Sequence, residues 1–373
     1  MTEGHPMLPQ ASLDEAAQQL FLRDLKGYVA EQLEPFEAAA AAALDPGEGH
    51  NDRVGHVYAK LHERPSFRDY ASLRRTSQEL LWDDVAVSVR RQAAALDAKA
   101  EIAEPKGSLT LAPAMRQPAY LDAADVHLMP GGYADDPGGV AQGALMDRGG
   151  AVYMLGRNGG LLNDVRGHTL AAHVLHRWPG LVPNRVLELG CGVGVSTLPI
   201  AAAFPQAEVH GLDVGASMLR YAHARAEHLG VAIHFHQGDA EHTGFAEGSF
   251  DLVFSCVLMH ETSPTAIDAI LCESHRLLRP GGVAVHLEVP NRYETMPLWA
   301  KIRGEIEHDY NNEPNWKTAI SIDYAAAMGA AGFADVVTGF QDSTSRPEPG
   351  NQGFGAENKG VFRSWFVTSG RRG

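Results

Sequence analysis

The sequence has 373 residues, of which 45% are hydrophobic and 21% are charged. This length predicts two domains or one large decorated domain, and the composition is typical of a globular protein rather than a disordered chain. The formal net charge of −15 disfavours binding to nucleic acid, because such proteins usually carry a basic surplus. No apolar run is long enough to cross a membrane, so we expect neither a nucleic-acid nor a membrane partner.

The cysteines and the first residues indicate the cellular compartment of the protein. Cys191, Cys256 and Cys272 have no spacing typical of a metal knuckle or a redox pair. The first ten residues, MTEGHPMLPQ, lack the basic and apolar regions of a signal peptide. We therefore expect a cytoplasmic protein with reduced thiols.

Residues 1–150 are expected to form a mainly helical N-terminal region. Ser12 and Glu15 fit a capping box at the start of a first helix, which Pro35 interrupts or follows. A second long helix is expected over residues 66–98. These helices can cover a substrate, form a homodimer contact, or simply be amphipathic helices of the core.

Within this region, residues 101–150 are predicted to be an irregular connector, because prolines and paired glycines break the helical pattern. Long loops in compact proteins are often functional. Residues of this connector that can line a pocket are Tyr120, Asp125, His127 and Tyr133.

Residues 151–373 alternate between strand and helix patterns, which predicts a Rossmann-like α/β domain with a mostly parallel sheet. Seven strands are expected, the last of them antiparallel, over residues 185–189, 208–212, 232–236, 250–256, 283–289, 334–339 and 361–368. Helices are expected over residues 161–178, 195–204, 216–229, 264–278 and 323–331. An irregular insertion near residues 290–320 is interpreted as a lid or as a surface excursion.

Three glycines, Gly190, Gly192 and Gly194, lie between the first strand of this domain and the next helix. Glycines let the backbone approach a ligand closely, and this position is the usual nucleotide site of a doubly wound sheet. A dinucleotide fingerprint requires glycine or alanine where this chain has Val195. The loop therefore suits a nucleoside that carries an amino acid better than it suits a pyrophosphate.

Two acidic residues follow the next two strands. Asp213 can accept hydrogen bonds from both ribose hydroxyls, although it is also a good helix N-cap. Asp239 can accept a hydrogen bond from the adenine amino group, and Ala240 leaves room for the adenine ring. The alternative is that these residues only form a turn.

From about residue 185 to 290, the chain resembles class I S-adenosylmethionine (SAM)-dependent methyltransferases. The resemblance is strongest to the small-molecule branch typified by enzymes of ubiquinone and menaquinone biosynthesis. The matching motifs are ELGCGVG (188–194), HGLDVGASML (210–219), QGDAEHTGF (237–245), SFDLVFSCVLMH (249–260) and RLLRPGGVAVHLEV (276–289). The resemblance implies SAM as cofactor, S-adenosylhomocysteine as product, and an antiparallel hairpin at the end of the sheet.

The resemblance also implies roles for single residues. Glu188 would position the SAM amino group, Asp213 the ribose and Asp239 the adenine. Further cofactor contacts are expected at the three glycines of the loop and at Val214, Met218, Ala240 and Ser255.

The segment after the fourth strand is expected to face the methyl group. His260 is the first candidate for a general base, because imidazole titrates near neutral pH, and Glu261 can orient it or act itself. The alternative is that His260 only packs against the next helix. Candidate substrate contacts are Tyr153, Arg157, Glu288, Tyr310 and Trp316.

No metal site is expected, because no cysteine or carboxylate completes a set with His234, His236 and His242. The favoured function is transfer of the SAM methyl group to a small organic acceptor by in-line displacement, in secondary metabolism. A SAM sensor or intramolecular chemistry on SAM is the alternative. A NAD-type oxidoreductase is disfavoured by Val195.

Overall fold

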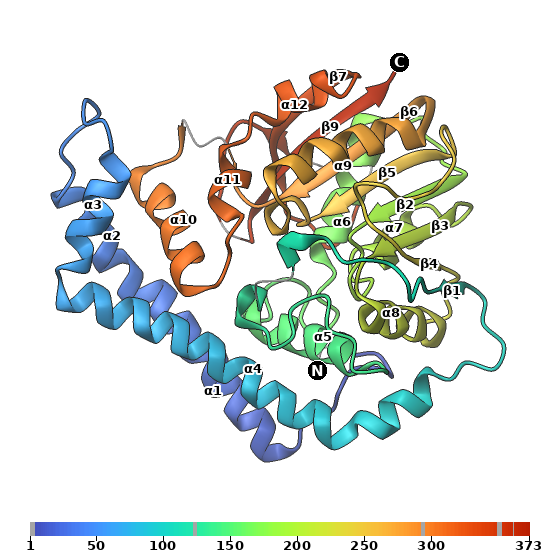
Figure 1. Ribbon diagram of the computed structural model, residues 1–373, viewed down its shortest axis with the longest axis horizontal. Coiled ribbons are helices and arrows are strands. Elements are labelled where there is room, and N and C mark those ends of the chain that lie inside the picture. The colour runs from blue at the N-terminus through green and yellow to red at the C-terminus, as the bar shows by residue number, and fades with distance from the viewer. Residues whose placement is uncertain (1–3, 122–124, 292–294, 349–352, 361) are drawn as a thin grey trace.

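The computed structural model describes residues 4–121, 125–291, 295–348, 353–360 and 362–373 (Figure 1). Its first helix, α1 (Leu13–Tyr28), begins at the expected capping box, in which Ser12 and Glu15 bond to each other's backbone N–H groups. The chain continues through one π-helical turn, η1 (Val29–Leu33), into α2 (Glu34–Ala43), with Pro35 in the first turn of α2. Proline is tolerated there because the first N–H groups of a helix have no partner within it.

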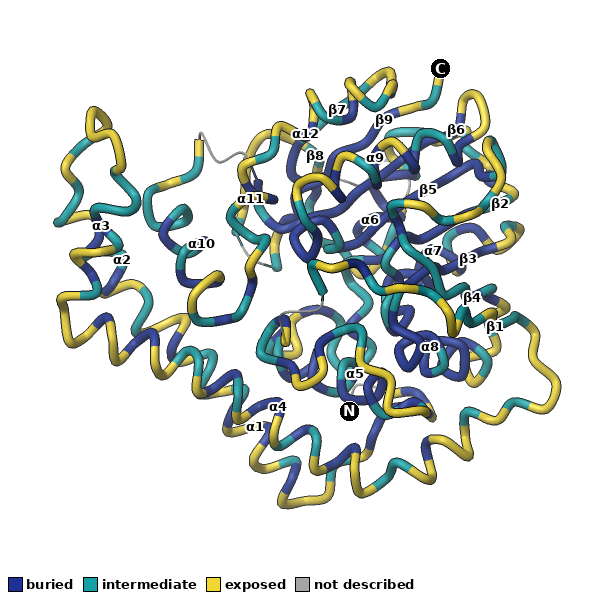
Figure 2. Tube along the Cα trace, in the orientation of Figure 1, coloured by how far each residue is buried: buried dark blue, intermediate teal, exposed yellow. Residues whose placement is uncertain are grey.

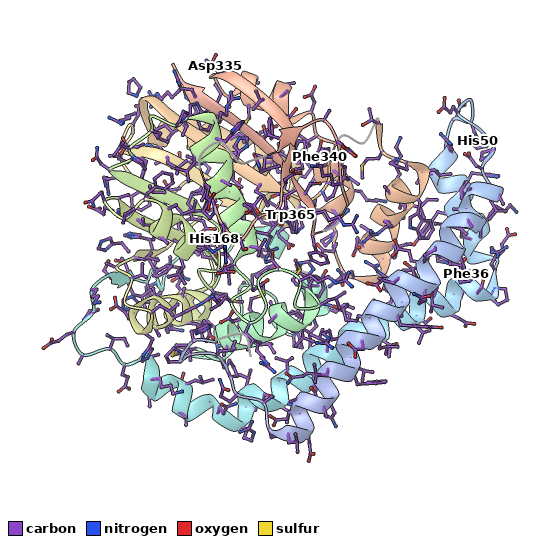
Figure 3. All side chains as sticks on the ribbon, turned by 180° about the vertical axis from the view of Figure 1, so that it is seen from behind. Phe36, His50, His168, Asp335, Phe340 and Trp365 are labelled. Carbon is purple, nitrogen blue, oxygen red and sulfur yellow. The ribbon has the colours of Figure 1, made fainter. Side chains whose placement is uncertain are left out.

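Two more helices complete the N-terminal helical region, defined here as residues 13–100. They are α3 (Arg53–His62) and the 36-residue α4 (Pro65–Ala100), which lies beside α1 in Figure 1. Seen from behind in Figure 3, Phe36 and His50 of this region lie at one end of the molecule, well away from His168 and Asp335 of the sheet domain.

The connector that follows is less irregular than expected. It contains a short strand, β1 (Ser108–Thr110), two 3₁₀ turns, η2 (Ala119–Leu121) and η3 (Val126–Leu128), and a 13-residue helix, α5 (Ala141–Tyr153). The prediction of irregular structure was wrong for α5. Its glycines permit close packing rather than turns, since a Cβ at Gly149 would lie 2.0 Å from the Trp82 ring of α4.

In the described residues the sheet has nine strands, so the expected count of seven was wrong. Their order is β1-β4-β3-β2-β5-β6-β9-β7-β8. Neighbours from β1 to β6 are parallel, and β9 is antiparallel to both β6 and β7, as expected. The extra strands, β1 and β8, are short edge strands with no alternating pattern to predict them. The remaining bounds are β2 (Arg185–Leu189), β3 (Glu208–Asp213), β4 (His234–Gln237), β5 (Phe250–Cys256), β6 (Leu278–Glu288), β7 (Phe333–Asp342), β8 (Phe354–Gly355) and β9 (Ser364–Arg372).

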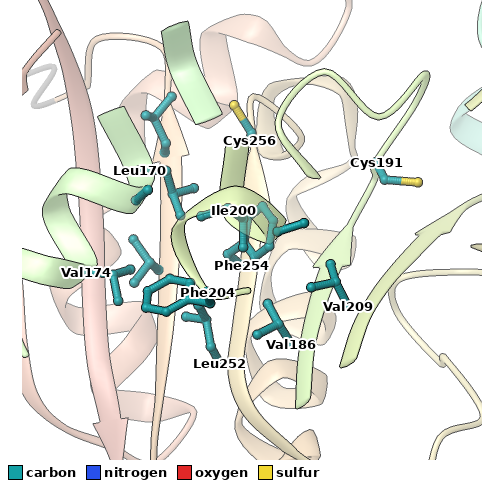
Figure 4. Packing of buried hydrophobic residues seen from close by; sticks show 14 of the residues in the cluster. Leu170, Val174, Val186, Cys191, Ile200, Phe204, Val209, Leu252, Phe254 and Cys256 are labelled. Atoms are coloured by element: carbon teal, nitrogen blue, oxygen red, sulfur yellow. The ribbon is translucent and has the colours of Figure 1, made fainter. Parts of the chain in front are cut away.

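Helices cover both faces of the sheet, so the central strands are almost wholly buried (Figure 2). On one face, Leu252 and Phe254 of β5 pack against side chains of α6 and α7 (Figure 4). On the other, Val253 packs with α9 and α12. The helices are α6 (Val165–Arg177), α7 (Thr197–Ala203), α8 (Ala216–His228), α9 (Pro264–Leu277) and α12 (Tyr324–Ala330).

The insertion after β6 forms two helices, α10 (Leu298–Tyr310) and α11 (Trp316–Ser321). Ile302 and Ile306 of α10 are buried against Val57, Leu61 and Phe67 of the N-terminal helical region. The insertion therefore joins that region to the sheet domain. In the described part of the chain, no helix is long and apolar enough to cross a membrane.

Candidate active site

A pocket opens at the edge where the parallel strands reach their carboxyl ends. Leu189 at the end of β2 pairs with Leu212 of β3 and with Ser255 of β5, so these strands end at the same level. This edge is the usual ligand site of a parallel sheet. The pocket encloses about 910 Å³, counting its open mouth, and its lining includes Glu188, Gly190, Gly192, Asp213, Val214, Asp239 and Ala240, all expected to bind cofactor.

The glycine loop is tied to β3 by backbone hydrogen bonds. The N–H groups of Gly190 and Cys191 donate to the Leu212 carbonyl at 2.8 and 3.0 Å. The N–H of Gly192 donates to Asp213 Oδ2 at 2.8 Å. The loop and the acid after β3 are therefore held as one rigid wall of the pocket.

The two strand-end acids occupy the expected positions. Asp213 is almost completely buried, and burial raises its pKa against the opposing effect of backbone N–H donors such as that of Gly215. The N-cap of α8 is Gly215, so Asp213 precedes the cap and its carboxylate faces the pocket. Asp239 accepts the Glu241 N–H at 2.9 Å, and Tyr120 of the connector lies on the same pocket lining.

Glu188 and Arg166 place an acidic and a basic side chain on the lining of the pocket. Glu188 is 1% exposed and accepts a hydrogen bond from the Thr197 hydroxyl. Burial raises the pKa of its carboxyl well above the usual range. The Nε of Arg166, on α6, is buried without a hydrogen-bond partner in the described structure, and its side chain lines the pocket. The pair suits a ligand that carries both an ammonium and a carboxylate group.

At the other end of the pocket, η4 (Met259–Glu261) presents His260 and Glu261. His260 Nδ1 lies 2.9 Å from Glu288 Oε2, and its Nε2 lies 3.2 Å from Glu261 Oε1. Burial alone lowers the pKa of His260, but the carboxylates of Glu261 and Glu288 outweigh it and raise that pKa to about 10. Glu261 also lines the pocket, so it connects this acidic and basic group to the pocket.

Two residues from distant segments complete this group. His127 Nε2 lies 3.0 Å from Glu261 Oε1, and His127 Nδ1 pairs with Glu313. The His127 carbonyl accepts hydrogen bonds from Gln78 Nε2 at 3.0 Å and Trp82 Nε1 at 2.8 Å. Helix α4 of the N-terminal helical region therefore fixes the position of His127.

Comparison with known proteins identifies the family. A family model described as a methyltransferase domain matches residues 186–282. An uncharacterized methyltransferase from Synechocystis is 34% identical over 175 residues, which cover 46% of this chain and 76% of that protein. The chain belongs to the class I SAM-dependent methyltransferases. SAM is accordingly its cofactor.

Other relatives of this methyltransferase are matched over shorter stretches. A trans-aconitate 2-methyltransferase from Deinococcus radiodurans is 32% identical over 43% of this chain and 60% of its own length. A malonyl-[acyl-carrier protein] O-methyltransferase from Methylococcus capsulatus is 36% identical over 31% of this chain and 40% of its own length. Among solved structures, the PH0226 protein from Pyrococcus horikoshii is 18% identical, covers 56% of this chain and 90% of that chain, and gives a TM-score of 0.40.

Three expected cofactor residues do not line the pocket of this methyltransferase. Gly194 faces Phe235 and Ala222 beneath the loop, and Met218 is buried in the cluster that packs under α5. Ser255 is buried inside β5, where its Oγ lies 2.9 Å from His286 Nδ1 of β6. These side chains support the pocket from below.

The expected substrate residues divide into two groups. Glu288, Trp316 and Tyr153 gather around the two histidines: the Trp316 ring centroid lies 5.1 Å from that of His260, and the Tyr153 centroid lies 5.4 Å from that of His127. The other two residues lie elsewhere. Arg157 pairs with the exposed Glu31, and Tyr310 stacks on His62 with ring centroids 6.1 Å apart.

Sequence reasoning assigned no role to Arg166 and did not connect His127 and Glu313 with His260. Arg166 lies on a helix with no motif around it. His127 and Glu313 precede and follow Glu261 by many residues, and they reach it through the hydrogen bond from α4 to His127 and the packing of α10 on the N-terminal helical region. Local sequence patterns carry no signal for such a contact.

Proposed function

We propose that this chain transfers the SAM methyl group to a small organic acceptor by in-line displacement. The observation that carries the proposal is the position of Glu261. It lines the cofactor pocket and also belongs to the buried group of His127, His260 and Glu313. A methyl group at that end of the pocket would meet an acceptor held by these side chains. Alignment and exclusion of water supply most of the catalysis in such a displacement.

The cofactor would bind with its ribose on Asp213 and its adenine beside Asp239. Its amino group would face Glu188, and its carboxylate would face the unpartnered Nε of Arg166. This orientation follows from the charges, because Glu188 and Arg166 lie at the inner end of the glycine loop while Asp239 lies two strands away. The sulfonium then comes between these ends, near Glu261.

The acceptor would carry a hydroxyl, enol or carboxyl oxygen. The names of the trans-aconitate and malonyl-[acyl-carrier protein] relatives support acceptors that contain carboxyl groups. Glu261 would accept a hydrogen bond from the acceptor, and His260, held by Glu288, would keep Glu261 in position. The aromatic side chains of Tyr133 and Trp316 would exclude water from the reacting atoms.

Calorimetric titration with S-adenosylhomocysteine tests the cofactor assignment. Asp213→Ala removes hydrogen bonds to the ribose, and we expect the dissociation constant to rise about 10- to 100-fold. The matched control is Asp268→Ala, which removes an exposed acid of α9 and should leave binding unchanged. Equal affinities for the two variants would refute the proposed ribose site.

Methyl transfer itself is tested with SAM labelled in its methyl group and a small-metabolite extract. We expect label in a low-molecular-weight product, and less of it with Glu261→Gln, although this variant still binds S-adenosylhomocysteine. If label stays on SAM across extracts that contain carboxylic and hydroxylated acceptors, the proposed activity is wrong.

Three further expectations stay predictions. They are a place in secondary metabolism, a cytoplasmic location, and a homodimer formed through the N-terminal helical region. The exposed apolar side chains of Leu13, Phe21 and Phe36 on α1 and α2 support the homodimer. Sedimentation of the wild-type protein and of a Phe21→Glu variant measures it directly.

A further inference from the structure

Four side chains at the methyl end of the pocket have the composition of a metal site. They are His127, His260, Glu261 and Glu313, and one ligand atom from each lies within 4.8 Å of the others. Three of them are at most 9% exposed, and His127 is 15% exposed. They come from three segments far apart in the sequence: η3, η4 and the link between α10 and α11.

The spacing of the ligand atoms suits one small ion. Ligand atoms about 2.0–2.1 Å from a tetrahedral ion are about 3.3 Å apart. Glu261 Oε1 lies 3.0 Å from His127 Nε2 and 3.2 Å from His260 Nε2, so three of the four groups are already near that separation. Glu313 lies against His127 Nδ1, on the other side of that imidazole, so binding of all four groups to one ion requires the Glu313 carboxylate to turn towards the other three ligand atoms, which lie within 4.8 Å.

Two carboxylate oxygens supply an independent observation. Glu261 Oε2 and Glu313 Oε2 are buried and have no hydrogen-bond partner in the described structure. Leaving a buried charged acceptor unsatisfied is costly, and an ion is one of the ordinary explanations for such a group. Both oxygens belong to the four-residue cluster, so a cation there would satisfy them.

The surroundings of His260 strengthen this assignment. Its Nδ1 lies 2.9 Å from Glu288 Oε2, which leaves Nε2 directed at the cluster. A carboxylate behind a histidine in this way is the usual support of a metal-binding imidazole. Three buried carboxylates, those of Glu261, Glu288 and Glu313, also face two imidazoles, and a divalent cation would offset two of their three negative charges.

We propose that His127, His260, Glu261 and Glu313 bind one divalent transition-metal ion at the methyl end of the SAM pocket. Imidazole and carboxylate together suit Zn²⁺, Co²⁺, Mn²⁺ or Fe²⁺, whereas Mg²⁺ and Ca²⁺ prefer oxygen ligands alone. The sequence analysis expected no metal site, because it considered only the histidines of β4 and its neighbourhood. Ion pairs between protonated histidines and carboxylates are the competing explanation of the cluster.

Metal binding does not depend on the reaction. The catalytic role of the ion does depend on the reaction, and it therefore rests on the proposed function. The ion would bind the acceptor oxygen, lower the pKa of the acceptor group and hold the oxygen in line with the methyl group. His260 and Glu261 would then act on the acceptor as ligands of the ion. The experiment below therefore measures metal binding with no acceptor present.

The protein is stripped with a chelator and titrated with Co²⁺, whose visible absorption reports nitrogen and oxygen ligands, and with Zn²⁺ by calorimetry. We expect about one ion per chain, with no competition from Mg²⁺ in about 100-fold excess. The nearly isosteric Glu313→Gln and the His127→Gln variants should each weaken Zn²⁺ binding at least about 10-fold. The Co²⁺ spectrum of each should also change.

His236→Gln is the matched control, because it removes a histidine that lies outside the cluster, 3.1 Å from His210. It should bind Zn²⁺ like the wild type. Absence of stoichiometric Zn²⁺ or Co²⁺ binding would overturn the proposal in favour of ion pairs, and loss of binding in His236→Gln alone would place the metal elsewhere.

Titration of every variant with S-adenosylhomocysteine separates the two proposals. Glu313 does not line the cofactor pocket, so Glu313→Gln should keep wild-type affinity, which also shows that it folds. Metal binding without methyl transfer to any acceptor would contradict the proposed function alone. Methyl transfer by a chelated protein that binds no metal would contradict the metal site alone.

Discussion

Gly192 is a residue of the pocket whose backbone conformation favours glycine. It has a φ of +50°, lines the pocket, and has open space where a Cβ would project. In Gly192→Ala, the left-handed conformation costs about 1 kcal/mol of stability, and the added methyl group enters the space needed by SAM. We expect calorimetry to show binding of S-adenosylhomocysteine weakened at least about 10-fold.

Gly281→Ala provides the comparison for this variant. Gly281 has a φ of +80° and equally open surroundings. It lies near the start of β6, shortly after α9, and away from the pocket. It should lose a similar amount of stability in urea denaturation and keep its affinity for S-adenosylhomocysteine. If both variants bind equally well, Gly192 does not face the cofactor.

How much of the site can be predicted from sequence depends on how local the contacts are. Asp213 is the last residue of β3 and Asp239 lies two residues after β4, so the strand pattern alone places them at the pocket. Ser255 also follows that pattern, but it lies one residue before the end of β5 and bonds to His286 within the sheet. His127 and Glu313 reach the site through tertiary packing, which no local pattern records.

At the scale of secondary structure, the prediction was accurate where hydrophobic pattern and length agree. The bounds of β2 and β5 match those expected, because both strands are short, mostly apolar and buried segments between turn residues. Helix α5 was missed because its glycines are typical of loops. A Cβ at Gly143 would lie 2.4 Å from Tyr221 Cβ, so these glycines serve contact with α8 and α4. A single sequence does not distinguish a packing glycine from a turn glycine.

The packing of α5 on α4 can be tested at Gly149. Gly149→Ala would place a methyl group 2.0 Å from the Trp82 ring, and overpacking of this kind costs about 1–3 kcal/mol. Gly27→Ala, in α1, has open space around the new methyl group and should stabilise by about 0.5–1 kcal/mol, because alanine favours helix. Urea denaturation measures both free energies of unfolding. Stabilisation by both variants would contradict the close packing of α5.

For the whole molecule, the main consequence is that the N-terminal helical region supports the cluster of His127, His260, Glu261 and Glu313. Gln78 and Trp82 of α4 hold the His127 carbonyl, and α10 packs on α2, α3 and α4 just before Glu313. The hydrogen bonds from Gln78 and Trp82 and the packing of α10 therefore all support the cluster that contains His127 and Glu313. Loosening of the N-terminal helices should open the acceptor end of the site and leave the glycine loop unchanged.

Stability against acid is also a property of the whole molecule, because His173 joins α6 to the far strands of the sheet. Its Nδ1 lies 3.0 Å from Gln341 Oε1 of β7, and its Nε2 lies 2.9 Å from Ser369 Oγ of β9. Burial lowers the pKa of His173 to about 4, outweighing the hydrogen bond that Gln341 Oε1 accepts from it. The unfolded chain, with an ordinary histidine pKa of about 6.5, therefore takes up this proton first as the pH falls.

The stability contributed by neutral His173 is present above about pH 6.5 and is lost as the pH falls toward about 4, by about 2 kcal/mol between about pH 7 and pH 5. Urea denaturation at these two pH values measures how much the unfolding free energy falls between about pH 7 and pH 5. In His173→Gln this fall should be smaller than in the wild type by about 2 kcal/mol. His176→Gln, which changes an exposed histidine of the same helix, should keep the wild-type decrease. If the unfolding free energy of His173→Gln falls as much as that of the wild type, His173 is protonated equally in the folded and unfolded chains. Other buried histidines such as His286 would then have to account for the loss of stability in acid.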